Sequence, residues 1–542
     1  MPPPSLLVTG GTDSVAPSLT GEGAGVNAFD VGSLSARRTT LGAAAILLAY
    51  TLINPVGFLG GGMDDWQYLN AARCWVAHGP CLPYDHWQAR WPLVAPLALA
   101  IRLIGENRIS VGFPSLLATI ACVPPLAMIG NRLFAPPVGF GGALLFLLTP
   151  IVGVELYDPN VETIELAFVA WGFLALMTGS DDPRLRWPAA AGLLFALAFQ
   201  TRETALVPIA VAGIWAACSY PRERLARAAV AASAAFLVPL LIEFTAFWDI
   251  TGDPLYRRTL SLRHVLIPST QLNAPIDPSS SPLFNPHYIA NWRHEPGLHL
   301  HWAIDGLANF LVNSRAGIAQ WCGPLLLWLY AGHVPTEDRR KAWLAFATAL
   351  TIASGLIYAL AIDPKARMLY SPIALCCLML AMVLLSLERS DKRLIARAII
   401  LVSLFTALST VAIFQQVHDA EPLARHWIAR APGRIATDPN TKRTFALVHE
   451  VERLPAPGKV GTDLMLTKIE KMTCDRWLRL SGLDALGWRV VEQSSLSYIS
   501  LVSNEVGGEL CLFDAGRTID AATFAAAVER IRRAQARRGV LV

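Results

Sequence analysis

Two adjacent carboxylates, Asp64 and Asp65, follow the first long apolar segment of the chain, after three glycines and a methionine. A pair of acids at the exit of a membrane helix is costly unless it faces water or a polar partner. An acid placed there can act as a general base on a hydroxyl group of a substrate that arrives from the lipid. The structural alternative is that Asp64 caps the helix that follows. Tyr68 is expected on one face of that helix, behind the acids.

Cations and polar residues also stand at the ends of later apolar segments, where charge is expensive in a membrane. They are Arg90 at the end of the first loop, the pair Arg202 and Glu203 between two short apolar segments, and Lys365 and Arg367 in a turn before Tyr370. A guanidinium can bind phosphate oxygens through two hydrogen bonds, so a lipid phosphate is the natural ligand of these cations. The alternatives are an interfacial anchor for Arg90, which has tryptophans nearby, and a structural ion pair between Arg202 and Glu203.

Glu155 and Asp158 separate two apolar segments, and His264 belongs to a long loop rich in histidine and aromatic residues. A carboxylate at this depth can bind a divalent metal or hold a basic neighbour, which makes Asp158 a candidate metal ligand. Asp158 also precedes a proline, and in that position it can start a helix. The loop could bind a metal or stack on sugar rings, but its histidines match no specific metal-binding spacing. No cofactor is assigned with certainty, and a divalent metal remains possible.

The composition is that of a polytopic membrane protein. Of the 542 residues 54% are hydrophobic and only 16% are charged, against about 25% charged in ordinary soluble proteins. The net charge of +4 gives no indication of nucleic-acid binding. Two cysteine pairs, Cys74 with Cys81 and Cys474 with Cys511, fall in predicted extramembrane regions, and each is a candidate disulfide if that side is oxidising.

The chain divides into three predicted parts. Residues 1–38 are rich in Gly, Ser, Thr and Pro and are expected to be a disordered cytoplasmic tail. About twelve apolar segments occupy 39–416, with outer loops at about 61–91 and 249–315. Residues 417–542 are predicted to form a small extracytoplasmic α/β domain. Its expected strands lie at 446–448, 489–491 and 510–513, and a basic amphipathic helix is expected over 523–537.

The basic loops set the predicted orientation, because cytoplasmic loops carry an excess of Lys and Arg. Clusters around Arg132, Arg222 and Arg393 are assigned to the cytoplasm. This assignment requires that the short segment 92–104 does not cross fully, and that 189–200 and 204–218 rise and return as a pair, since a span needs about 20 residues. All the charged clusters described above then share the outer face with the C-terminal domain.

In this order along the chain, the motifs resemble those of the GT-C glycosyltransferases of the protein mannosyltransferase, aminoarabinose transferase and Rgt-like type, which are similar to glycosyltransferase family 39. The motifs are Asp64-Asp65-Trp66-Gln67-Tyr68, Arg90-Trp91-Pro92, Asp158-Pro159, Arg202, and the segment from Arg367 to Pro372. The resemblance covers roughly 40–390. The family usually has Asp-Glu in place of the acid pair and often has Lys in place of Arg90 and Arg202. The Trp-Trp-Asp motif of the oligosaccharyltransferases is missing from the sequence, which argues against transfer of a whole glycan.

The resemblance implies an α-helical polytopic GT-C-like fold and an inverting hexosyl- or pentosyltransferase. The donor would be a sugar on a polyprenyl phosphate, and the acceptor a hydroxyl of a glycan, lipid or protein. The site would face the periplasm of a bacterial inner membrane, in lipopolysaccharide synthesis or protein glycosylation of the cell envelope. Asp64 and Asp65 match the catalytic acid positions. The donor phosphate would be held by Arg90, Arg202, Lys365 and Arg367, with Tyr68, Glu155, Asp158, Glu203, His264 and Tyr370 in supporting roles.

Two other functions are open from sequence alone. A transporter or flippase of a lipid-linked substrate would hold its ionisable groups near the middle of the bilayer and often has inverted repeats. In this chain the charges are predicted at one face, beneath a large loop and a domain, which favours an enzyme. A non-catalytic scaffold subunit is the third possibility, and the acid pair argues against it.

Overall fold

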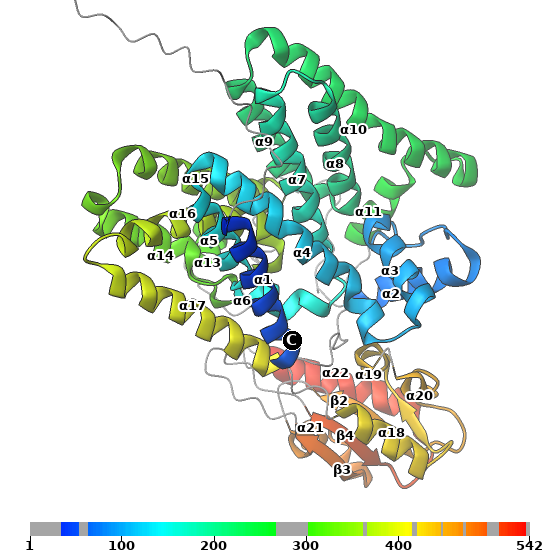
Figure 1. The fold of residues 1–542 in the computed structure, drawn as a ribbon. Coiled ribbons are helices and arrows are strands. Elements are labelled where there is room, and N and C mark those ends of the chain that lie inside the picture. The colour runs from blue at the N-terminus through cyan, green and yellow to red at the C-terminus, as the bar shows by residue number, and fades with distance from the viewer. Residues whose placement is uncertain are drawn as a thin grey trace, which may run out of the picture.

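The computed structural model describes residues 34–53, 63–266, 302–360, 366–414, 420–445, 448–469, 473–495 and 509–537. These residues form a large helical part and, at one end of it, a small unit built around a sheet (Figure 1). This architecture confirms the predicted fold class.

The helical part begins with α1 to α11. In chain order these are α1 (Leu34–Ile53), α2 (Met63–His78), α3 (Trp91–Ile104), α4 (Arg108–Leu133), α5 (Pro136–Leu147), α6 (Pro150–Val154), η1 (Glu155–Tyr157), α7 (Val161–Asp181), α8 (Arg186–Thr201), η2 (Glu203–Ala205), α9 (Leu206–Ser219), α10 (Arg222–Thr251) and α11 (Tyr256–Leu266). It continues with α13 (Trp302–Val312), η4 (Ser314–Ala316), α14 (Ala319–Leu329), η5 (Ala331–His333), α15 (Thr336–Ser354), η6 (Gly355–Ala359), η7 (Ala366–Leu369), α16 (Tyr370–Glu388) and α17 (Arg393–Phe414).

Six helices of the described chain are long and apolar enough to cross a membrane. They are 108–133, 161–181, 222–251, 336–359, 366–388 and 393–411. The pair 137–147 and 150–157 makes a seventh candidate, bent by 58°. The bend follows from Pro150, which lacks an N–H and holds Thr149 in an extended conformation before it. The apolar segments predicted at 92–104, 111–129, 161–178, 189–200 and 226–248 each lie within one helix, whereas the segment predicted at 138–156 is divided between α5, α6 and η1.

The short segment α3 begins and ends on the same side of the bundle. Arg90, at its start, contacts Tyr68 of α2. Glu106, just past the end of α3, pairs with Arg73, which also belongs to α2, at 2.6 Å. With 14 residues α3 is also shorter than the candidate spans, and that it does not cross fully stays a prediction.

The pair α8 and α9 rises along α7 and returns. Near the start of α7, Thr204 donates a hydrogen bond to Glu165 at 3.0 Å. Near the other end of α7, Tyr220 donates to the carbonyl of Leu176 at 2.8 Å. The 21 residues of α7 span about 30 Å, so the turn at Arg202 lies far from the ends of the pair, as predicted.

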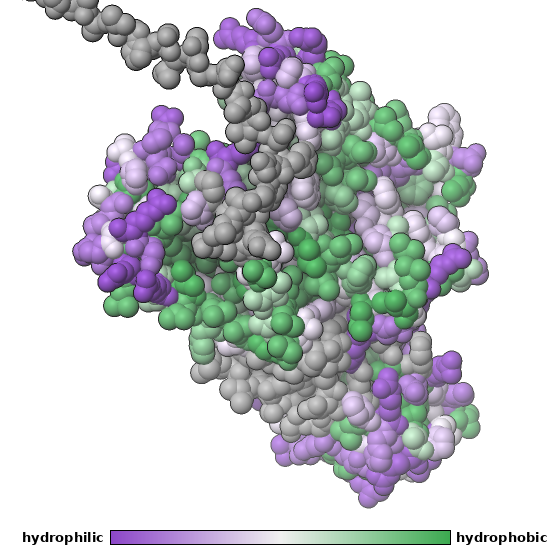
Figure 2. Space-filling model, in the orientation of Figure 1, coloured by the Kyte–Doolittle hydropathy of each residue, from purple (hydrophilic) through white to green (hydrophobic). Residues whose placement is uncertain are grey.

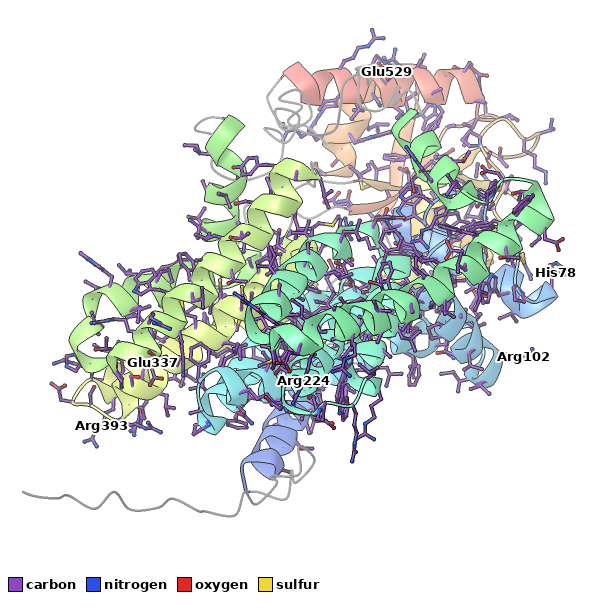
Figure 3. The ribbon with its side chains drawn as sticks, turned by 90° about the horizontal axis from the view of Figure 1, so that it is seen from above. His78, Arg102, Arg224, Glu337, Arg393 and Glu529 are labelled. Atoms are coloured by element: carbon purple, nitrogen blue, oxygen red, sulfur yellow. A yellow bond between two sulfur atoms is a disulfide. The ribbon has the colours of Figure 1, made fainter. Side chains whose placement is uncertain are left out.

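The basic residues Arg224 and Arg393 lie away from the C-terminal unit. Glu337 and Arg393 lie at the lower left of Figure 3 and Arg224 at its lower centre, while Glu529 of the C-terminal unit lies at the top. Between them, the visible face of the helical part carries a broad apolar area that is bordered by hydrophilic residues (Figure 2). This pattern agrees with a bundle whose two ends face water on opposite sides of a membrane.

The C-terminal unit contains α18 (Ala420–Arg430), β1 (Ile435–Thr437), α19 (Pro439–Thr444), α20 (His449–Glu452), β2 (Leu464–Ile469), α21 (Cys474–Ser481), η9 (Asp484–Leu486), β3 (Arg489–Ser495), β4 (Glu509–Asp514) and α22 (Ala521–Arg537). The strand order is β1-β2-β4-β3, with β1 parallel to β2 and the other pairs antiparallel. Side chains alternate between the two faces of the sheet. Leu464 and Leu466 pack on a core with Trp427 of α18, and Met465 and Phe513 on a core with α21 and α22.

Two of the three predicted strands and the predicted helix are confirmed as β3, β4 and α22. The prediction of a strand at 446–448 was wrong for Val448, the described residue of this stretch. Residues 446–447 lie outside the described residues, and Val448 immediately precedes α20 and packs into the core with α18. Strands β1 and β2 were not predicted, because three and six residues give too short a pattern to distinguish a strand from other apolar runs.

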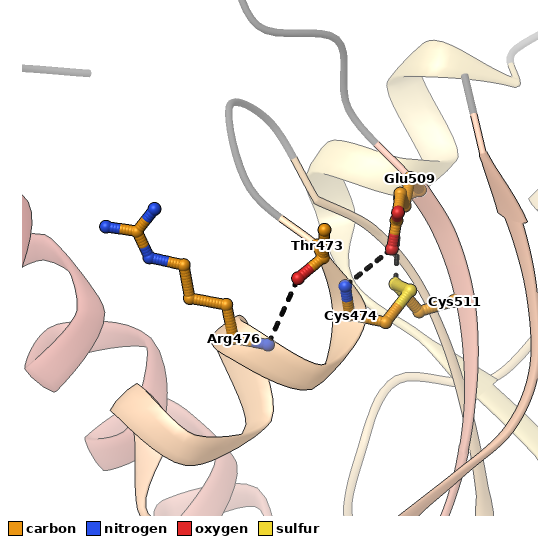
Figure 4. The surroundings of a disulfide bond; sticks show 5 residues. All are labelled: Thr473, Cys474, Arg476, Glu509 and Cys511. Atoms are coloured by element: carbon orange, nitrogen blue, oxygen red, sulfur yellow. Dashed lines mark hydrogen bonds between the residues drawn. A yellow bond between two sulfur atoms is a disulfide. The ribbon is translucent and has the colours of Figure 1, made fainter. Parts of the chain in front are cut away.

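Both candidate disulfides are formed, Cys74–Cys81 in the first loop and Cys474–Cys511 in the C-terminal unit. The second joins the start of α21 to β4, and the backbone N–H of Cys474 donates to the Glu509 carboxylate at 2.6 Å (Figure 4). The first disulfide lies in the loop after α2, whose Arg73 pairs with Glu452 of the C-terminal unit at 2.7 Å. Both bridges therefore lie at the same end of the molecule.

Candidate active site

Asp64 lies in the first turn of α2, where the exposed N–H groups and the helix dipole favour a negative charge. Its carboxylate oxygen Oδ2 is 3.3 Å from Nη2 of Arg367, which lies 303 residues later in η7. Both side chains are about one-third exposed, at 31% and 29%. Asp64 therefore pairs with a distant arginine and reaches the surface, which capping alone would not require.

Arg90 is buried at the N-terminal end of α3, and its Nη1 donates a hydrogen bond to the hydroxyl of Tyr68. Tyr68 stands one helical turn after Asp64, so both side chains lie on one face of α2. Burial disfavours the charged form of Arg90, but the pKa of its guanidinium is raised, because interactions with Tyr68 and three acids outweigh burial. The acids are Glu203, Glu162 and Asp64. A buried arginine among acids is not an interfacial anchor, so that alternative was wrong.

Arg202 pairs with Glu162 of α7, with 3.0 Å between Nη1 and Oε1, and both side chains are buried. Glu203 pairs instead with Arg257 of α11 at 2.9 Å. The alternative of a structural ion pair between Arg202 and Glu203 was therefore wrong. The backbone of Arg202 is extended, with φ −162° and ψ 135°, and an extended residue points its side chain away from that of its neighbour.

Asn160, two residues past Asp158, caps α7 through a hydrogen bond from the backbone N–H of Thr163 at 3.1 Å. The alternative in which Asp158 starts this helix was therefore wrong by two residues. The side-chain amide of Asn160 also donates to Glu155 at 3.5 Å and to the hydroxyl of Tyr370 at 3.3 Å. Tyr370 is fully buried and donates to the carbonyl of Ile151 at 3.4 Å. Glu155 and Tyr370 thus support the turn that carries the start of α7.

Asp158 is held by its backbone. Its carbonyl accepts a hydrogen bond from the hydroxyl of Ser115 in α4, and this hydroxyl accepts from the N–H of Asn160 at 2.8 Å. The acids whose charge acts most strongly on Arg367 are Glu155, Glu162, Asp64 and Asp65. Through these backbone contacts Asp158 helps to fix the turn that precedes α7.

The three predicted arginines have one acid in common. Glu162 is in contact with Arg202 and interacts electrostatically with Arg90 and Arg367. The structure thus brings Asp64, Arg90, Arg202 and Arg367 to one end of the bundle around a carboxylate that was missed as a site residue. The available signal was two acids three residues apart, Glu162 and Glu165, at the start of an apolar span, where charge tends to be functional.

The Nε–H group of Arg367 is a buried hydrogen-bond donor. Among the described residues, no hydrogen-bond acceptor meets its buried Nε. A buried N–H without a partner is unfavourable, and an anion that reaches Asp64 and Arg367 from outside would satisfy it. Two further predicted residues cannot be placed in this way. Lys365 lies outside the described residues, and His264 lies in α11 with its side chain outside them.

A grouping of potential metal ligands in the described chain is Cys474, Glu509 and Cys511. Its two sulfurs are joined in a disulfide, so neither is available as a thiolate ligand. Asp158 does not belong to this grouping.

The fold and this charged end define a multi-pass membrane protein with a polar site at one face of its bundle. Residues 92–248 match the model of the family described as dolichyl-phosphate-mannose-protein mannosyltransferase. The match confirms the predicted resemblance over this segment, which contains Glu162, Arg202 and Glu203. A comparison with curated proteins finds no match.

Solved structures similar to this chain include ArnT and an archaeal oligosaccharyltransferase. ArnT from Cupriavidus metallidurans in the apo state is 13% identical, with 91% of this chain and 99% of that chain covered and a TM-score of 0.40. The archaeal oligosaccharyltransferase AglB from Archaeoglobus fulgidus, in complex with an inhibitory peptide and a dolichol-phosphate, is 11% identical, with 82% and 71% covered and a TM-score of 0.47. TM-scores this low do not align individual side chains, so no residue role is transferred from these proteins.

Proposed function

We propose that this chain is an inverting membrane glycosyltransferase that moves a sugar from a polyprenyl-phosphate donor to a hydroxyl acceptor. The observation that carries the proposal is the convergence of Asp64 and Arg367 with Arg90, Arg202 and Glu162 at one end of the bundle. A carboxylate beside several cations has the parts that transfer from a phosphate-linked sugar needs. The matched family is named for such a donor.

In the proposed reaction the acceptor oxygen attacks the anomeric carbon as the bond from that carbon to the phosphate oxygen breaks. Asp64 takes the proton of the acceptor hydroxyl, a role worth about 10²–10⁴ in rate. The leaving phosphate gains negative charge, and Arg367, Arg90 and Arg202 stabilise it. Attack from the face opposite the leaving group inverts the anomeric centre.

We assign the site to the periplasmic face of a bacterial inner membrane. Both disulfides lie at the end of the molecule that holds Asp64, and disulfides persist in oxidising compartments. Arg224 and Arg393 lie away from the C-terminal unit (Figure 3), and the positive-inside rule assigns their basic loops to the cytoplasm.

Incubating membranes with a radiolabelled polyprenyl-phosphate sugar tests the proposed activity. The enzyme is expected to release polyprenyl phosphate and to place label on a membrane glycan, lipid or protein. A transporter or flippase would move the intact labelled lipid between leaflets without splitting it. Recovery of label only on the unchanged lipid, with the wild-type chain present, would reject the transferase and leave the transporter.

Replacing Arg367 by Gln is expected to weaken binding of polyprenyl phosphate about 10- to 100-fold. A hydrogen bond to a charged group contributes about 1.5–3 kcal/mol, and Arg367 has a buried Nε available for such a bond. The dissociation constant of purified protein in detergent is the measurement. Arg397→Gln is the control, because Arg397 is exposed and pairs with Glu388 at the far end of the bundle. Equal affinities of the Arg367 variant and the wild type would remove Arg367 from the donor site.

A further inference from the structure

Arg257 is a buried arginine that the proposed reaction does not use. It lies in the first turn of α11, and its side chain is only 8% exposed. Its guanidinium reaches three separate segments. Nε donates to Glu203 at 2.9 Å, Nη1 to the carbonyl of Ala89 at 3.2 Å, and Nη2 to the carbonyl of Gln200 at 2.7 Å.

These contacts lie next to both buried arginines of the site. Ala89 directly precedes Arg90, and Gln200 and Glu203 flank Arg202 on its two sides. Arg257 bonds the backbone in two of the three contacts, so it fixes the path of the chain on which the other two arginines stand. Its planar, forked head makes this possible, because five N–H donors leave it in fixed directions.

The bond to Gln200 also completes the end of α8. The last four carbonyls of a helix have no partner within it, and α8 ends at Thr201. A cation near these carbonyls is favoured by the helix dipole. Arg257 therefore ends α8 at a defined residue and sets where Arg202 leaves the helix.

The helix that carries Arg257 is itself held firmly. Asp253 accepts hydrogen bonds from the N–H of Leu255 at 2.9 Å and the hydroxyl of Thr259 at 2.7 Å, which fixes the start of α11. Tyr256 donates to the carbonyl of Pro83 at 3.1 Å, which is a second bond to the loop that leads to Arg90. Leu260 is buried on the same helix.

A second acid completes the surroundings of Arg257. Glu243 of α10 is 3.6 Å from its Nη1, is buried, and accepts from the side chain of Gln200 at 2.9 Å. Removing the positive charge would leave Glu243 without a cation, which is strongly unfavourable for a buried ion. A useful variant of Arg257 must therefore keep the positive charge but remove the forked guanidinium with its several donors.

We propose that Arg257 is a positioning residue that holds Arg90 and Arg202 in the geometry that binds the donor phosphate. This inference rests on the proposed function, because it names which residue sets the geometry of the same site. Arg257 itself touches neither the phosphate nor the sugar in this proposal. It acts through Ala89, Gln200 and Glu203.

Arg257→Lys tests the proposal, because a lysine keeps the charge beside Glu243 but cannot bond three segments at once. The first readout is the rate at which a maleimide labels a cysteine placed at Ala89, in a Cys218→Ser background that removes the exposed free thiol. Ala89 is buried, so labelling is expected to be slow in the parent and at least about tenfold faster with Arg257→Lys, as the loop is released. Arg258→Lys is the control, since Arg258 is exposed on the same helix.

The second readout is a double-mutant cycle on the affinity for polyprenyl phosphate. Arg90→Gln is expected to weaken binding in the wild type and to weaken it several-fold less in the Arg257→Lys background, because Arg90 is already displaced there. Additive effects in this cycle, or a labelling rate unchanged by Arg257→Lys, would overturn the positioning role. A different result would separate the two proposals. If Arg257→Lys speeds labelling but the wild-type protein neither binds the lipid nor transfers sugar, the proposed function is rejected. Arg257 then remains the residue that holds both arginines.

Discussion

Replacing Asp64 by Asn is expected to lower the rate of sugar transfer by about 10²–10⁴ while the protein still folds and inserts. Asparagine has nearly the same shape as aspartate and can still accept a hydrogen bond from Arg367, but it cannot take a proton from the acceptor hydroxyl. Folding should change little, because the ion pair of Asp64 and Arg367 is partly exposed and such pairs contribute little to stability. The initial rate of label transfer from a polyprenyl-phosphate sugar, at equal amounts of purified protein, is the measurement.

The chain offers a matched control for this change. Asp475 also lies in the first turn of a helix, α21, in the C-terminal unit. It is exposed, so Asp475→Asn should transfer sugar at the wild-type rate. If Asp64→Asn does the same, Asp64 is not the base, and the proton must leave by another route.

Glu162→Gln is expected to destabilise the protein by about 3–5 kcal/mol, because it leaves the buried charge of Arg202 without its partner. Glutamine fits the space but carries no charge. The effect should appear as a lower midpoint of thermal unfolding for the protein purified in detergent. Removing both charges, with Glu162→Gln and Arg202→Gln together, should recover part of the loss, since no isolated ion then remains.

Glu388→Gln is the matched control for the stability measurement. Glu388 also pairs with an arginine, Arg397, at 2.7 Å, but both side chains lie at the exposed end of the bundle. This change should leave the unfolding midpoint unaltered. If Glu162→Gln shifts the midpoint no more than Glu388→Gln does, then Glu162 is not the carboxylate that holds the arginines together.

Much of the fold was predictable because membrane spans are read from long apolar runs. Most predicted apolar segments coincide with described helices, and the turn between α8 and α9 follows from segments too short to cross alone. In contrast, α11 and α13 lie in the stretch that was predicted as the outer loop 249–315. That α3 does not cross fully stays a prediction, which rests on its length and on the positions of the basic residues. In the small sheet β3 and β4 were predicted but β1 and β2 were not, because short strands give too few residues for an alternating pattern to be recognised.

The site was predicted as a set of residues but not as a set of pairs. The sequence identified Asp64, Arg90, Arg202 and Arg367 because charges at the ends of apolar segments are expensive and therefore informative. The alternative to phosphate binding by Arg202 was an ion pair with its neighbour Glu203, whereas the fold pairs Arg202 with Glu162, forty residues earlier. It also passed over Arg257, which lies in a polar segment where an arginine is unremarkable.

The sequence by itself determined which stretches enter the membrane and which side chains are too costly to lie there without a function or a partner. Both follow from the chemistry of single residues and their neighbours in the chain. Only the tertiary structure decided which acid meets which arginine, since those contacts join residues that are from 40 to more than 300 positions apart. Such pairings depend on how α2, α7, α8 and η7 pack against one another, and packing geometry is not contained in local patterns of charge and hydropathy.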